Sequence, residues 1–146
     1  MGIETASETE VITRLRLAVM RLARRLRQHS QEGELTPSLI AALSSIERLG
    51  PLTLSELAAA ERVQPPSMTR IVSRLEDAGF IVREVDPADR RSAKVRLSPA
   101  GSRVLGRSRT KKNIYLGERL ASFTPAERTL LEQALPLLER LIGDEG

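Results

Sequence analysis

The sequence predicts a mainly α-helical protein with one small antiparallel β-hairpin, and three observations support this fold class. Three segments open with a helix start signal, Ser or Thr followed by proline, at Thr36, Ser98 and Thr124. An amphipathic segment between them begins at two prolines and stops at Gly79. Two short β-prone runs follow, joined by a connection rich in proline and aspartate.

Composition predicts one domain, residues 1–146, and excludes several kinds of site. The chain has no cysteine and a single histidine, His29. Disulfides, a thiol redox switch and a Cys- or His-based zinc site are therefore excluded, and no cofactor is expected. No run approaches the roughly 18 apolar residues of a membrane span, and no basic segment precedes an apolar core at the N-terminus. We expect a soluble cytoplasmic protein with no membrane partner.

The first two helices follow from their start signals and apolar spacing. After Met1–Ser7, which we expect to be disordered, a helix spans Glu8–Gln28 with apolar residues on more than one side, so it needs more than one neighbour. Gln31–Leu35 is predicted to be a polar loop. The second helix starts at Thr36-Pro37, runs to about Leu49 and ends at Gly50.

The next two helices form a helix-turn-helix. Thr53 and Glu56 make a capping-box pattern that opens a short helix ending near Val63. A tight turn then leads to a second helix over residues 65–78. Its apolar stripe has the spacing i, i+3, i+4 and i+7 and consists of Met68, Ile71, Val72 and Leu75.

A different side of this second helix carries Ser67, Arg70 and Arg74, with Thr69 and Ser73 beside them. Its first turn is therefore small and polar, and both arginines point away from the core. A helix that is thin at its tip and cationic along its flank fits a DNA major groove.

The β-prone runs, Phe80–Val85 and Ala93–Leu97, read as a hairpin joined by Asp86–Ser92. Arg90 and Arg91 fall near its tip. A helix-turn-helix followed by such a hairpin is a winged helix, here residues 35–97.

Two helices complete the chain, one from Ser98 to about Ala121 and one over Pro125–Ile142. The basic run Arg107–Lys112 fits a solvated face and a phosphate contact about equally well. The first and last helices carry more apolar surface than a monomer tolerates. We therefore predict a two-fold dimer through residues 8–30 and 98–143, with two recognition helices about one DNA turn (~34 Å) apart on a palindromic site.

The charge distribution agrees with DNA binding. Arg62 to Lys112 holds 13 Lys/Arg against 5 Asp/Glu, whereas the rest of the chain holds 10 against 14. This polarity would supply the electrostatic attraction that dominates nucleic-acid affinity. An ordinary Arg-rich solvated surface explains it equally well by itself. The chain has only two Phe and one Tyr, which favours duplex DNA over single strands.

The residues that carry these patterns resemble the MarR family of bacterial transcription regulators. The matching segments are LTLSELA (Leu52–Ala58), SMTRIVSRLEDAGFIVRE (Ser67–Glu84) and DPADRRSAKVRLSPAG (Asp86–Gly101). The flanking helices fit in length and order, so the resemblance covers nearly the whole chain. It implies a homodimeric repressor that binds a double-stranded palindromic operator.

The resemblance also implies roles for individual residues. Ser67, Thr69, Arg70 and Arg74 match groove-facing positions of the family's recognition helix. Residues 86–92 match the wing, where Arg90 and Arg91 would enter the minor groove. Asp89 would position the wing arginine through an ion pair, or it is a plain turn residue. The double proline Pro65-Pro66 departs from the family's pattern and removes two N–H groups that could bind phosphate.

Regulators of this kind release DNA when a small, often aromatic or phenolic, ligand binds between the dimer helices and the winged helix. The sequence offers weak candidates for such a site, namely Met20, Arg24, His29 and Tyr115, with Arg16 beside them. His29 and Tyr115 fit ordinary helix-end and interface positions better. The family's redox-sensing members need a cysteine and its zinc-responsive members several histidines, which this sequence lacks.

Two other classes compete with this interpretation. A winged helix can serve protein–protein contact without an operator, although arginines at a hairpin tip have less purpose there. An enzyme is disfavoured because the sequence has no cysteine nucleophile, no Gly-rich phosphate loop and no metal-ligand cluster.

Overall fold

The computed structural model describes residues 6–33 and 35–143, apart from the side chains of residues 90 and 91. The chain forms two units, Met1–Lys112 and Asn113–Gly146, with the boundary inside one helix. None of the described helices is both long and apolar enough to cross a bilayer. The elements in chain order are α1 (Glu8–His29), α2 (Pro37–Leu49), β1 (Leu52–Thr53), α3 (Leu54–Glu61), α4 (Pro65–Asp77), β2 (Ile81–Asp86), β3 (Asp89–Leu97), α5 (Pro99–Leu120) and α6 (Pro125–Ile142).

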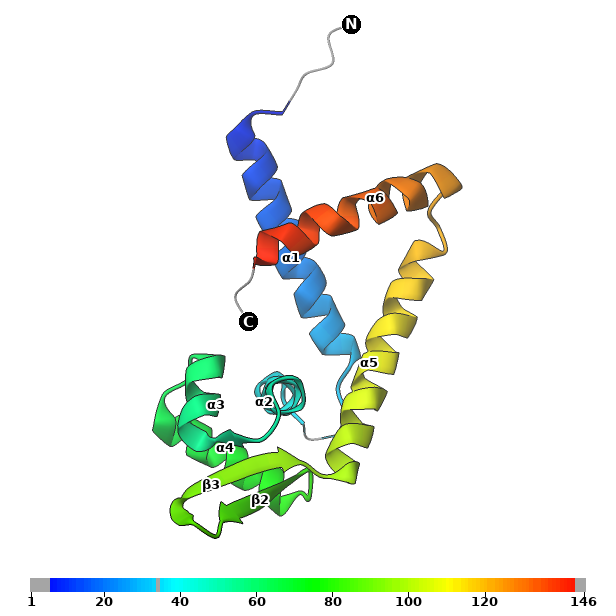
Figure 1. The fold of residues 1–146 in the computed structure, drawn as a ribbon. Helices are drawn as coiled ribbons and strands as arrows, with labels where there is room; N and C mark the ends of the chain where they lie inside the picture. The colour runs from blue at the N-terminus through cyan, green and yellow to red at the C-terminus, as the bar shows by residue number, and fades with distance from the viewer. Residues whose placement is uncertain (1–5, 34, 144–146) are drawn as a thin grey trace, which may run out of the picture. The chain divides into compact units, whose positions relative to one another are not determined.

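The fold class is confirmed: the described chain is mainly helical and holds one small antiparallel sheet (Figure 1). The predicted caps are present, since the hydroxyls of Thr36 and Thr53 each accept a backbone N–H three residues on. Thr124 and Glu127 form a full capping box. Ser7 caps α1 in the same way and so is not part of a disordered tail, while residues 1–5 lie outside the description.

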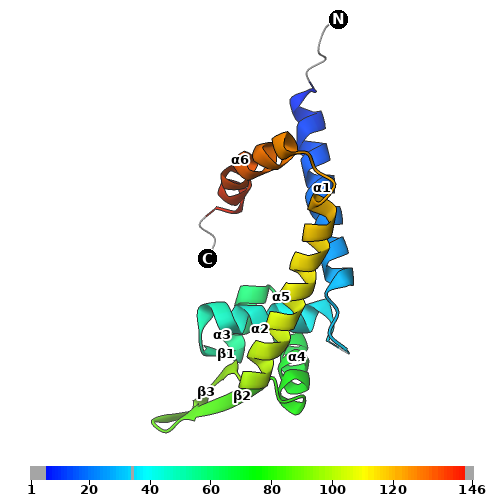
Figure 2. The ribbon, with the colours of Figure 1, turned by 90° about the vertical axis from the view of Figure 1, so that its right-hand side faces the viewer.

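The sheet has the strand order β1-β3-β2. β1 is only two residues long, too short to leave a periodic pattern, and it was not predicted. Within the predicted runs, the strands pair from Ile81↔Leu97 to Val85↔Ala93. They also continue beyond these runs, because Asp86 belongs to β2, Asp89–Ser92 belong to β3, and Asp86 pairs with Asp89 after a shift in register. The predicted seven-residue connection is in fact a two-residue turn, Pro87–Ala88. Figure 2 shows the hairpin extending away from the helices beside it.

The core of the first unit lies between α2, α3, α4, the sheet and the first turns of α5. Its largest fully buried side chains are Leu43, Ile46, Leu57, Met68, Leu75, Leu105, Val72, Val95 and Val104. This packing fixes α4 and the root of the hairpin against the same core.

α5 starts against the root of the hairpin, and two residues make this contact possible. The Ser98 hydroxyl donates to the Gly79 carbonyl and accepts the Gly101 N–H at 3.1 Å. A Cβ on Gly101 would lie 2.1 Å from the Phe80 carbonyl oxygen. Only glycine therefore allows α5 to approach the chain this closely.

The terminal helices α1 and α6 contain no buried residue. Both display large exposed apolar side chains, which are Val11, Ile12, Leu15, Val19, Met20 and Leu22 on α1 and Leu130, Leu135, Leu137, Leu141 and Ile142 on α6. The apolar excess predicted for these two helices is thus present on the described chain.

Candidate nucleic-acid interface

The turn between α3 and α4 is short and sharply defined. α3 ends two residues earlier than predicted because Arg62 adopts the left-handed conformation, with φ of 52°, and its N–H returns to the Ala58 and Ala59 carbonyls. Val63 donates to the Ala58 carbonyl at 2.9 Å. Gln64 is the N-cap of α4, and its side chain makes no capping hydrogen bond. Three residues therefore connect the two helices of the helix-turn-helix.

One face of α4 is buried as its spacing predicts. Met68, Val72 and Leu75 are all but inaccessible, and Ile71 is half-buried against the same core. Because these side chains fix the rotation of the helix about its axis, the opposite face must point outward. Thr69, Arg70, Ser73 and Arg74 are exposed on it, and Ser67 is half-buried at its edge.

The first turn of α4 has few free backbone donors. Pro65 and Pro66 carry no N–H, and Met68 already donates to the Gln64 carbonyl at 3.0 Å. The Thr69 hydroxyl donates to the Pro65 carbonyl at 3.0 Å. Its hydrogen is therefore engaged, and it can meet a base only by accepting a hydrogen bond. Recognition by this turn must rest on side chains more than on the backbone.

Arg70 and Arg74 are free to bind an anion. Across the described residues neither forms an ion pair, and the nearby helix acid Glu76 is already paired with Arg83 at 3.1 Å. Two exposed guanidinium groups spaced i, i+4 on one helix face lie one turn apart. Such groups can bind bidentately to guanine or to phosphate oxygens.

The hairpin carries a mixture of paired and free charges. Asp86 accepts the Ala88 N–H at 2.9 Å and closes the turn, and Asp89 accepts the Ser92 hydroxyl at 2.9 Å. The predicted ion pair between Asp89 and a wing arginine falls on side chains outside the description. The backbones of Arg90 and Arg91 lie in β3, next to the turn rather than in it.

Lys94 is a candidate contact that the sequence did not single out. It lies opposite Glu84 in the strand register, yet Glu84 pairs diagonally with Arg96 instead. Lys94 is exposed and makes no ion pair with any residue within the described ranges. The sequence could not show that Lys94 lacks an acid, because it does not say whether Glu84 pairs with Lys94 or with Arg96.

The basic run of α5 is engaged within the chain. Arg107 and Lys111 both pair with Glu32, at 3.2 and 2.7 Å, and Arg109 pairs with Glu47 at 2.6 Å. All three side chains are nevertheless exposed, as the predicted solvated face requires, and the phosphate contact stays a prediction. They attach α5 to the segments before it.

Glu32 is the centre of this network. The hydrogen bond from Lys111 lowers the pKa of the Glu32 carboxyl, helped by Arg107 and opposed by its partial burial. The predicted polar loop around it is partly wrong, because Leu35 at its end is only 8% exposed and belongs to the core. Because the pKa of Glu32 is lowered, its carboxylate is ionised at neutral pH.

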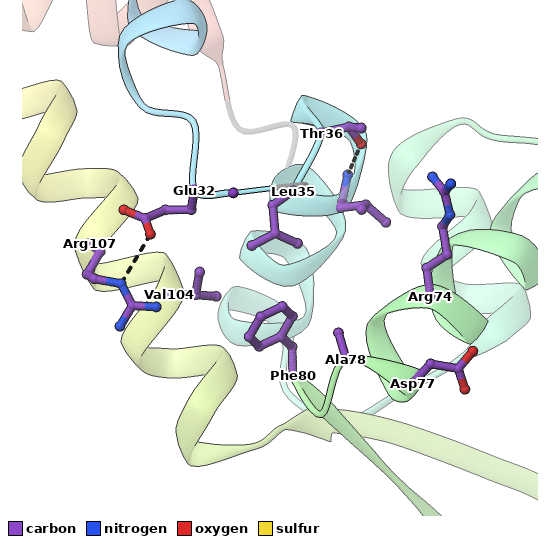
Figure 3. A pocket seen from close by; sticks show the side chains of 11 residues that line it. Glu32, Leu35, Thr36, Arg74, Asp77, Ala78, Phe80, Val104 and Arg107 are labelled. Carbon is purple, nitrogen blue, oxygen red and sulfur yellow. Dashed lines mark hydrogen bonds and ion pairs between the residues drawn. The ribbon is translucent and has the colours of Figure 1, made fainter.

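A hollow of about 790 Å³ opens beside this network (Figure 3). Leu35, Phe80 and Val104 give it an apolar wall, and Arg74 and Arg107 stand at its margins. Such a mixture of apolar walls and few polar groups suits a small organic ligand. The predicted ligand candidates do not line it: Met20, Arg24 and His29 are exposed on α1, and Tyr115 belongs to the second unit. Among the described residues no cluster of acids and histidines suits a metal ion.

Comparison with known proteins places this geometry in a family. Residues 35–93 match the model of the MarR family. An uncharacterised HTH-type transcriptional regulator of Mycobacterium leprae is 37% identical over 138 residues, which cover 94% of this chain and 96% of that protein.

Solved structures are similar over nearly the full length. A putative transcriptional regulator from Pseudomonas aeruginosa is 36% identical, with a TM-score of 0.85 over 97% of this chain and 100% of that one. A MarR family protein from Bacillus stearothermophilus is 26% identical, with a TM-score of 0.78 over 94% of this chain and 99% of that one.

Proposed function

The chain belongs to the MarR family of DNA-binding transcription regulators. We propose that it is a homodimeric repressor that binds double-stranded DNA sequence-specifically and leaves the DNA when a small ligand binds to the protein. The prediction of a regulator rather than an enzyme is confirmed by this membership. Repression, assembly as a two-fold dimer and release by a ligand are proposals.

The observation that carries the proposal is the pair of free arginines on α4. Residues 65–78 enter the major groove, where Arg70 and Arg74 contact base edges or phosphates and Thr69 accepts a hydrogen bond from a base. The support is geometric: Met68, Val72 and Leu75 bury the opposite face of this helix, so Arg70 and Arg74 point into solvent, where DNA can reach them.

The wing, residues 86–92, enters the adjacent minor groove through Arg90 and Arg91, with Asp89 as the residue that positions them. Ser67 lies at the edge of the major-groove surface, where its small side chain allows close approach. The length of the hairpin supports this assignment, since paired strands carry these residues beyond the core.

The dimer forms through residues 8–30 and 98–143. A second copy is the proposed partner because α1 and α6 bury none of their residues within one chain. Two-fold symmetry then places two recognition helices about one DNA turn (~34 Å) apart and requires a palindromic operator.

A small aromatic or phenolic effector completes the proposal. The hollow between Leu35, Phe80, Val104 and Arg107 supports it as a site, because Arg74 lies both on its margin and on the groove-facing side of α4. A ligand that engages Arg74 there would compete directly with DNA.

Selection of binding sites from a random duplex library tests the function. We expect an inverted repeat with half-sites about 10 base pairs apart, a dimer mass by light scattering, and reduced transcription from a reporter promoter that carries the selected site. Recovery of no preferred sequence would reject the proposal and leave protein–protein contact as the use of the winged helix.

A further inference from the structure

The winged helix is joined to the terminal helices by two chain connections. The first is the link of residues 30–36 between α1 and α2, and the second is α5. Glu32 lies in the first connection, and its cationic partners lie in the second. A single carboxylate therefore bridges both routes by which the winged helix is held.

The geometry of this bridge is that of a clasp. One Glu32 oxygen lies 3.2 Å from Arg107 Nε and the other lies 2.7 Å from Lys111 Nζ. The two cations are four residues apart on α5, so the carboxylate spans a full helical turn. The Glu32 side chain is only 14% exposed, whereas Arg107 and Lys111 are 57% and 44% exposed, so solvent screens the two contacts from the side of the cations. Figure 3 shows the bond to Arg107 crossing from the link to α5.

The link itself is short and fixed at both sides of Glu32. Lys111 also donates to the Gln31 carbonyl at 2.8 Å, and Leu35 donates to the Glu32 carbonyl at 3.0 Å. Leu35 is buried in the core of the winged helix. Gln31 and Leu35, on the two sides of Glu32, are thus each held by contacts of their own.

A second ion pair on α5 provides a comparison. Arg109 pairs with Glu47, which lies on α2 inside the winged helix and not on the link. That pair fastens α5 to the winged helix without touching the route through α1. Removing Glu47 therefore tests the attachment of α5 to the winged helix, whereas removing Glu32 tests the attachment of the two connections to each other.

We propose that Glu32 is a positioning residue for DNA binding: by clasping Arg107 and Lys111 it locks the two connections together and fixes the spacing of the two recognition helices. This inference rests on the proposed function. Its consequence is that the clasp governs the distance between half-sites, while contact with each half-site stays with α4 and the wing.

The first experiment needs no DNA. The chain has no cysteine, so spin labels at Arg21→Cys on α1 and Ala60→Cys on α3 form a unique pair, both at exposed positions. Labelled protein is diluted with unlabelled protein so that only distances within one chain are measured. We expect Glu32→Gln to broaden the distance distribution and Glu47→Gln, the matched control with the same charge change, to leave it unchanged.

The second experiment uses duplexes in which the selected half-sites are separated by spacers one to four base pairs shorter or longer. The wild type is expected to prefer one spacing sharply. Glu32→Gln is expected to lose about tenfold at that spacing, within the coupling that residues of one network show, and to bind the other spacers nearly as well. Glu47→Gln keeps the wild-type preference.

Thermal unfolding of each variant tests whether it is folded at the assay temperature. If Glu32→Gln is not folded, Arg107→Gln gives a second way to open the clasp. Arg107→Gln should broaden the distances as Glu32→Gln does, and the double variant should add little. Unchanged distances in a folded Glu32→Gln or Arg107→Gln variant, or equal broadening in Glu47→Gln, overturns the inference. Absence of any DNA binding overturns the proposed function instead, while the label distances still report on the clasp.

Discussion

The cations of α4 and those of α5 look alike in sequence and differ completely in the fold. Arg70 and Arg74 are exposed and without an ion partner within the described chain, whereas Arg107, Arg109 and Lys111 are all held by carboxylates. Both groups contribute to the same basic stretch of sequence. Charge density alone therefore does not identify a DNA contact; the decisive property is whether the chain itself supplies an acid.

The difference arises from where the acids lie. The link before α2 and the end of α2 bring Glu32 and Glu47 against α5. The only ion pair that α4 makes within the described residues, Glu76 with Arg83, removes an acid from the helix surface and leaves both of its arginines free. The charges of Arg70 and Arg74 are thus directed outward without an acid beside them, whereas those of Arg107, Arg109 and Lys111 are partly neutralised by Glu32 and Glu47.

The largest effect that would break this comparison comes from detaching α5. Gly101→Ala places a methyl group 2.1 Å from the Phe80 carbonyl oxygen, and α5 must shift to relieve the contact. We expect a loss of about 2–4 kcal/mol in the free energy of unfolding, measured by urea denaturation. Gly106→Ala is the matched control, because its Cβ meets open space in the same helix, and it should stabilise by about 0.5–1 kcal/mol. Equal losses in both would show that α5 is not seated through Gly101.

Removing a free arginine tests the other side of the comparison. Arg70→Ala should reduce discrimination between the selected site and random DNA by about 1–3 kcal/mol. The free energy of unfolding should stay within about 0.5 kcal/mol of the wild type, because no partner is lost. Competition binding against both duplexes measures the first quantity. Arg48→Ala, which removes an exposed cation from α2, should weaken both duplexes alike.

Acid should weaken the attachment of α5 through Glu32. The folded-state pKa of Glu32 is lowered from its ordinary value of 4.5, so its stabilising effect is complete above that value and is lost as the pH falls through the lowered pKa. Glu32→Gln should be less stable than the wild type by about 1–2 kcal/mol at pH 7, the low end of what hydrogen bonds to charged groups contribute, because Arg107 and Lys111 are about half exposed. The gap should close as the pH drops below 4.5. Urea denaturation of both proteins across this range measures it, and a gap independent of pH would exclude the Glu32 charge as its source.

The sequence could predict α4 well because its two faces are set by local spacing. Met68, Val72 and Leu75 bury one side, and the exposure of Arg70 and Arg74 follows from geometry alone. The pairing of Arg107 with Glu32 was beyond reach, because the two residues are 75 positions apart and meet only through the packing of α5. The strands of the hairpin were predicted too short for a related reason. Only Ile81 of β2 is buried, so the outer strand residues carry no apolar alternation to reveal them.

The smallest expected effect is on the salt dependence of DNA binding, which should differ between a cation without an acid partner and a paired one. Lys94 has no acid partner among the described residues, so as a phosphate contact its replacement by glutamine should reduce the slope of log K against log salt by about 0.9. Arg109→Gln removes the same charge from a cation that Glu47 already neutralises, and its slope should match the wild type. Fluorescence anisotropy with one duplex at several salt concentrations measures both slopes. A reduction as large for Arg109→Gln would mean that the ion pair opens on DNA, because a cation still bound to its carboxylate releases no counterion from the duplex.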